Sequence, residues 1–173
     1  MSRFVVPVIM IVTAALSRLV PHPPNVAPIT ALALFSAVYL DRRLSFVIPL
    51  AALLLSDIFL GFYAGMIWVY ASFAAIAGIG IWLSSHRGIF QTAGASLAGS
   101  LLFFIVTNFG VWISSQVSYP HTFAGLTECY VAAIPFFRNT LVGDMGYVAM
   151  MFGLYEVLKK FIPALNPDAE AAE

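Results

Sequence analysis

Long apolar stretches, separated by short segments that hold most of the charge, are the feature that most constrains this chain. A helix needs roughly 20 mostly apolar residues to cross about 30 Å of hydrocarbon. Six stretches approach or exceed this length, over residues 4–20, 27–40, 45–62, 66–84, 92–115 and 138–161. The sequence therefore predicts an all-α integral membrane protein, a compact bundle of about six transmembrane helices within residues 1–162.

The composition also indicates that the protein lies in a membrane. Only 9% of the residues are charged and 61% are hydrophobic, whereas a soluble domain carries about 25% charged residues. This number of charges is too small to cover a water-facing surface. The outer surface must therefore face lipid. The net charge is zero, and the absence of a basic run or RNA-binding motif argues against a nucleic-acid partner. The lone Cys129 can form no internal disulfide.

The basic residues predict the orientation of the helices. Cytoplasmic loops of membrane proteins are enriched in lysine and arginine. Six of the eight basic residues fall at alternate ends of the predicted spans, namely Arg3, Arg42, Arg43, Arg87, Lys159 and Lys160. We therefore expect a multi-pass protein of the bacterial inner membrane with both termini in the cytoplasm. Residues 163–173, acidic and alanine-rich at their end, are expected to form a disordered cytoplasmic tail.

Two segments interrupt the regular pattern. The run from Pro21 to Pro28 holds four prolines, and proline lacks the amide donor that a helix interior requires. We expect a structured or re-entrant loop there. The mostly apolar segment 116–137 is too short and interrupted for another span, which favours an external surface helix or a lid over the bundle mouth.

Charged residues inside the predicted spans are the first candidates for function, because a charge at the bilayer centre costs about 2.5–3.5 kcal/mol. Arg18, Asp57, Arg138 and Asp144 are of this kind, and the predicted topology places all four in the outer half. Two interpretations stay open. The charges pair to hold the bundle together, or they surround a polar ligand at the outer mouth.

Uncharged polar side chains are predicted at the same level. Asn108 and Trp112 are four residues apart and so share a helix face. The Asn108 amide needs a partner, either on another helix or on a ligand. Tyr63 is a candidate ligand contact or a member of an interfacial aromatic belt. Asn25 lies in the first external loop and Asn139 begins the sixth span.

No catalytic or metal-binding signature accompanies these residues. The chain lacks Gly-x-Ser-x-Gly, His-Glu-x-x-His and a phosphate-binding glycine loop. His22 and His121 alone make no metal site. The sequence therefore predicts neither an enzyme nor a cofactor.

Four motifs in order resemble a family of small bacterial membrane proteins assigned to transport. They are RLVPHPPNVAPITALALF (18–35), LLSDIFLGFY (54–63), TNFGVW (107–112) and IPFFRNTLVGD (134–144). That family is similar to the substrate-binding S components of energy-coupling-factor (ECF) vitamin transporters. The resemblance implies six helices and a pocket open to the outside for a vitamin-like micronutrient, with cobalamin among the ligands of such proteins. It also implies a membrane coupling subunit with ATPases as partner.

Carried over residue by residue, the resemblance implies a substrate-binding set of Asn25, Asp57, Tyr63, Asn108, Trp112, Arg138, Asn139 and Asp144. S components meet their coupling subunit through small residues on the first helix. Here the clearest such stripe, Ala27 and Ala31, is on the second span. The leading hypothesis is a membrane subunit that binds and translocates a micronutrient. The alternatives are a non-transporting scaffold or assembly subunit, and a membrane enzyme that uses Asp57, Asp144 or the histidines.

Overall fold

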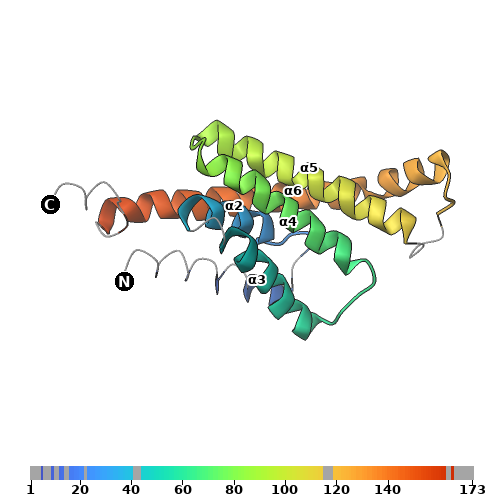
Figure 1. Cartoon of the computed structure of the whole chain (residues 1–173), viewed down its shortest axis with the longest axis horizontal. Helices are drawn as coiled ribbons and strands as arrows, with labels where there is room; N and C mark the ends of the chain where they lie inside the picture. Colours follow the sequence, from blue (N-terminus) through green and yellow to red (C-terminus); the bar gives the residue numbers. More distant parts are fainter. Residues whose placement is uncertain are drawn as a thin grey trace.

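All the regular structure in the described part of the chain is helical. The computed structural model describes residues 16–21, 23–40, 44–114 and 119–162, together with residues 5, 9, 12, 13 and 165. The elements are a short 3-10 helix η1 (Ser17–Leu19) and the α-helices α2 (Ile29–Tyr39), α3 (Leu44–Leu60), α4 (Met66–Ser84), α5 (Ile89–Ile113) and α6 (Phe123–Phe161) (Figure 1). Of these, α4, α5 and α6 are long and apolar enough to cross a membrane. The all-α prediction is confirmed.

Several predictions fall on residues that lie outside this description. They concern most of the span 4–20, His22, the basic residues Arg3, Arg42 and Arg43, and the tail 163–173 apart from Leu165. Two other basic residues bear on the orientation. Arg87 and Lys159 line one groove and therefore lie at the same end of the bundle, as the predicted orientation requires.

Helix α2 forms the centre of the bundle. Every residue from Ile29 to Val38 is buried, and the helix packs against α3, α4, α5 and α6 (Figure 1). The sequence predicts a span over 27–40, but α2 has 11 residues and measures only about 16 Å. It begins after Pro28, whose carbonyl accepts the Leu32 amide at 2.8 Å. A helix this short and this buried is a core element of the bundle.

Small residues allow α4 and α5 to approach α2 closely. A Cβ atom added to Gly80 would lie 2.7 Å from Ala37 Cβ and 3.1 Å from the Ala33 carbonyl oxygen. A Cβ at Gly99 would lie 3.1 Å from the Thr30 methyl carbon. Two of the small-residue pairs in the sequence, Ala33/Ala37 and Ala95/Gly99, therefore contribute to packing inside this chain.

Helix α6 differs from the prediction at its start. The sequence predicts a sixth span at 138–161 and a separate surface helix or lid before it. The observed helix runs without a break from Phe123 to Phe161, through Pro135. Its 39 residues measure about 58 Å, and its first amide groups are capped by the Thr122 hydroxyl, which accepts from Gly125 N at 3.2 Å. The segment 123–137 is thus the first part of α6, and it packs on α5, where Tyr130 Oη donates to the Ile105 carbonyl at 2.7 Å.

The outer surface of the bundle is apolar. Phe90, Phe123, Ile89 and Phe59 are 86%, 85%, 80% and 77% exposed. Soluble monomers rarely expose large contiguous apolar surface, so these side chains fit a lipid-facing surface. Hydroxyl groups within the helices bond to their own backbone, as Ser72 does to the Trp68 carbonyl at 2.7 Å.

Candidate functional site

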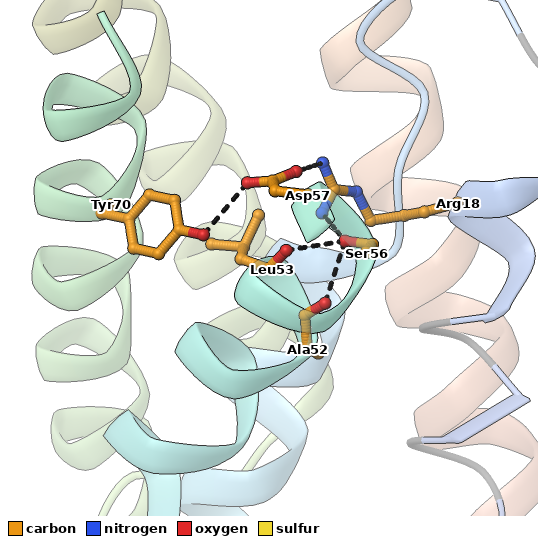
Figure 2. A network of polar contacts seen from close by, with 6 residues as sticks. All are labelled: Arg18, Ala52, Leu53, Ser56, Asp57 and Tyr70. Carbon is orange, nitrogen blue, oxygen red and sulfur yellow. Dashed lines mark hydrogen bonds and ion pairs between the residues drawn. The ribbon is translucent and has the colours of Figure 1, made fainter. Parts of the chain in front are cut away.

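A buried ion pair joins the first part of the chain to α3. Arg18, in η1, extends its guanidinium to Asp57, near the end of α3, with 3.2 Å between Arg18 Nη2 and Asp57 Oδ1. The Arg18 side chain is 13% exposed and the Asp57 side chain 1%. Figure 2 shows Arg18 approaching from one side of Asp57 and Tyr70, from α4, approaching from the other.

Both Asp57 oxygens are occupied. Tyr70 Oη donates to Asp57 Oδ2 at 3.0 Å, while Arg18 Nη1 also donates to Ser56 Oγ. Ser56 Oγ in turn donates to the carbonyls of Ala52 and Leu53 at 2.9 and 2.8 Å (Figure 2). A carboxylate with a cation and a hydroxyl on its two oxygens is well compensated for its burial. The network therefore clamps η1, α3 and α4 together.

Tyr63 lies beside this network, in the connection between α3 and α4. Its side chain is 44% exposed. Partial burial raises the pKa of its hydroxyl above the ordinary value of 10.0, and the nearby Asp57 carboxylate adds to the rise. Tyr63 is therefore a neutral hydroxyl at physiological pH, able to donate or accept one hydrogen bond.

The proline-rich loop after η1 is held against α6. Asn139 Nδ2 donates to the Pro24 carbonyl at 3.2 Å, and Gly143 allows close contact with Val26, since an added Cβ would lie 3.2 Å from Val26 Cα. Within the loop, the Val26 amide donates to the Pro23 carbonyl at 3.1 Å. Asn25 occupies the left-handed region at φ 63°, which asparagine tolerates better than most residues, and its side chain is exposed.

An open groove of about 810 Å³ lies between this loop and α6. Its lining among the described residues is mostly apolar, from Pro23 and Val26 on the loop side to Val142 and Met150 on α6. The polar side chains Arg138 and Asn139, the rings of Phe136 and Tyr147, and the backbone at Gly143 and Gly146 are interspersed. Arg138 is exposed and brings the only charged side chain among those lining residues.

Asp144 lies on α6 next to Gly143 but points into the bundle. It is 3% exposed. Ser100, on α5, donates to Asp144 Oδ2 at 2.7 Å, and Thr30, on α2, is a second side-chain partner. Among the residues that the structure describes, no basic nitrogen lies within ion-pair distance of this carboxylate. Ser96, one turn before Ser100, has a buried hydroxyl with no hydrogen-bond partner among the described atoms.

Asn108 and Trp112 lie in the α5–α6 hairpin. Asn108 Nδ2 donates to the Phe104 carbonyl of its own helix at 2.8 Å, and its backbone carbonyl faces the Cys129 thiol at 3.5 Å. Trp112 Nε1 donates to the Pro120 carbonyl at 2.9 Å, and His121 Nε2 lies 3.0 Å from the Trp112 carbonyl. These bonds stabilise the connection between the two helices.

Comparison with known protein families places the chain in one of them. The model of a family of unknown function (DUF6580) matches residues 1–165. The chain belongs to this family. No curated protein matches the sequence, and no solved structure does. The resemblance to S components of ECF transporters stays a prediction, since the DUF6580 family carries no assigned function.

The eight residues predicted as a substrate-binding set fall into four groups. Asn25, Arg138 and Asn139 gather at the loop and the groove. Asp57 and Tyr63 lie at the Arg18 network, Asp144 contacts Ser100, and Asn108 and Trp112 lie in the hairpin. Sequence reasoning missed Tyr147 and Ser100 as members of these sites. An intramembrane serine four residues from another serine was the available signal for Ser100.

Proposed function

We propose that this protein is a membrane-embedded subunit that binds and translocates a vitamin-like micronutrient. The proposal places the ligand in the groove between the proline-rich loop and α6. It retains the predicted topology, with both termini in the cytoplasm of a bacterial inner membrane and with the short, buried α2 kept as one of the six spans. The groove then opens toward the non-cytoplasmic side, from which the ligand enters.

The observation that carries the proposal is the size and lining of this groove. Small-molecule sites are mostly apolar clefts of about 300–1,000 Å³ in which a few polar groups fix orientation. The groove has about 810 Å³ and pairs an apolar wall with Arg138, Asn139 and the Tyr147 ring. Such a lining suits a ring-containing ligand with a polar or anionic edge, the ring against Tyr147 and the edge at Arg138.

The buried charges support the proposal by holding the loop in place. The Arg18–Asp57 pair fixes the loop at its start and Asn139 fixes it at Pro24. In this account Asp57 is a positioning residue. The four-motif resemblance to S components supports a membrane coupling subunit with ATPases as the energy source, since this chain has no phosphate-binding loop.

A thermal-shift screen of the purified full chain against vitamins and cofactor precursors tests the proposal. We expect one chemical class to raise the melting temperature, with Arg138→Gln weakening its affinity by about tenfold, as for loss of one charge-assisted contact. Glu128→Gln, on the exposed face of α6 outside the groove, is the matched control and should bind normally. Unchanged affinity in Arg138→Gln would exclude this site.

The second candidate function is a non-transporting scaffold subunit. It is favoured by the Arg18–Asp57 network, in which Asp57 bonds to Arg18 of η1 and to Tyr70 of α4 and is only 1% exposed. This function predicts no ligand-induced shift across the whole screen, together with stable co-purification of a membrane partner. The membrane-enzyme alternative predicts turnover of a lipid or vitamin precursor by the purified protein.

A further inference from the structure

A second groove lies on another face of α6, and its charged residues lie near the carboxyl end of that helix. It has a volume of about 670 Å³ and is bounded by the ends of α2 and α4, the start of α5 and the last part of α6. In Figure 1 the start of α5 and the end of α6 diverge at this end of the molecule. Apolar side chains such as Leu83, Ile89 and Phe152 form its walls. None of these residues belongs to the groove proposed for the micronutrient.

One rim of this second groove is formed by Tyr39, Arg87, Glu156 and Lys159, and Thr92 is a further polar lining residue. Lys159 Nζ contacts Glu156 Oε2 at 3.1 Å, and Tyr39 Oη donates to Glu156 Oε1 at 2.8 Å. Arg87 Nε donates to the Ser84 carbonyl at 3.0 Å and Nη2 to the Val38 carbonyl at 3.0 Å. Because backbone carbonyls carry no net charge, the positive charge of Arg87 is not neutralised by these bonds. Two cations and one carboxylate leave the rim with one net positive charge.

The apolar part of the groove opens sideways. Met145, Ala149 and Gly153, on the α6 wall, are all exposed, and no side chain fills the space at Gly153, where an added Cβ would have nothing within 4 Å. The helices that flank the opening, α5 and α6, are among those able to cross a membrane. An opening between two such helices faces hydrocarbon, so that an acyl chain can enter it from the bilayer.

We propose that this groove binds one anionic glycerophospholipid, with an acyl chain along the apolar wall and the phosphate at Arg87 and Lys159. The phosphate diester carries one negative charge and complements the net charge of the rim. Basic pockets between transmembrane helices at the positively charged side of a membrane protein bind anionic head groups in this way. The proposal is independent of the micronutrient site, because the two grooves share no lining residue.

Lipid retention measured by native mass spectrometry tests this proposal. The full chain is purified from mixed micelles that contain equal amounts of phosphatidylglycerol and phosphatidylcholine. We expect one retained phosphatidylglycerol per chain, at about fivefold excess over phosphatidylcholine, the effect of one net basic charge near a head group. Gly153→Leu places a side chain in the groove and should abolish retention. Gly146→Leu, seven residues earlier on the same helix and outside this groove, should retain the lipid.

The remaining variants separate the two parts of the site. Lys159→Gln should remove the preference for phosphatidylglycerol while leaving some lipid bound. If Arg87→Gln fails to fold because the Val38 carbonyl loses its donor, Lys159→Gln and Gly153→Leu still test whether the groove binds the lipid. Excess inorganic phosphate should not displace the lipid. Displacement by phosphate alone, equal retention of both lipids, or normal retention in Gly153→Leu would overturn the proposal.

Discussion

At the scale of single residues, the two carboxyl groups buried in the described part of this protein are each hydrogen-bonded to neighbouring helices. Asp57 has a cation on one oxygen and a phenol on the other, and Asp144 has hydroxyl partners from α5 and α2. A half-pair in an apolar interior is costly because the remaining charge has lost water without gaining a partner. Both carboxylates thus tie helices together, and neither lines the groove beside Arg138.

The Arg18–Asp57 pair gives a prediction at this scale. Asp57→Ala should lower the free energy of unfolding by about 3 kcal/mol, since Arg18 stays buried without its carboxylate. Arg18→Met combined with Asp57→Leu should cost less than Asp57→Ala alone, because no unpaired charge is left. Titration with a denaturing detergent, followed by circular dichroism, measures both. A double variant less stable than the single one would contradict this account of the clamp.

At the scale of elements, the close contact between α2 and α4 depends on one glycine. Gly80→Ala should destabilise the protein by about 1–3 kcal/mol, because its Cβ would lie 2.7 Å from Ala37 Cβ. Gly78, two residues earlier on the same helix, is the matched control, since an added Cβ there meets nothing within 4 Å. Gly78→Ala should be neutral or stabilising by up to about 1 kcal/mol. Thermal melting in one detergent compares the two variants, and equal melting temperatures would contradict the predicted contact.

The sequence predicts some of these elements well. The sequence predicts a span over residues 66–84, and α4 has the same bounds, because a glycine-containing turn precedes it and Ser85 and His86 follow it. The start of α6 was missed. The sequence predicts a separate surface helix or lid within 116–137, but Thr122 caps a helix that continues through Pro135. The burial of α2 was also not predictable, because hydrophobic periodicity does not distinguish an apolar helix that faces lipid from one that faces protein.

At the scale of the whole molecule, the predicted orientation can be tested with the described connections. Cys129 is 2% exposed, so an impermeant maleimide should not label the unmodified protein. Ala124→Cys, near the start of α6, should be labelled in intact cells. Ser85→Cys, between α4 and α5, should be labelled only after the membrane is opened. Labelling of Ser85→Cys in intact cells would reverse the proposed topology.

The candidate site shows which spatial neighbours can be predicted from the sequence alone. Asn25 and Asn139 are 114 positions apart in the sequence, yet both belong to the predicted substrate-binding set. The hydrogen bond from Asn139 to the Pro24 carbonyl brings their two motifs into contact. Asn108 and Trp112 are one helical turn apart, but Trp112 bonds to the Pro120 carbonyl and Asn108 to the Phe104 carbonyl of its own helix. Spacing identifies the face of a helix, whereas the neighbour of that face depends on tertiary packing.

The central claim, that the groove beside Arg138 holds a small molecule, is tested most directly by native mass spectrometry of gently purified protein. Gly146 lines this groove, and an added Cβ there has nothing within 4 Å, so that Gly146→Leu obstructs the groove without an overlap at Cβ. We predict a small-molecule adduct, different in mass from any phospholipid, on the wild type and on Gly153→Leu, and its loss in Gly146→Leu. An adduct of the same mass and occupancy on Gly146→Leu, or no adduct on any variant even after incubation with the vitamin panel, would contradict the claim.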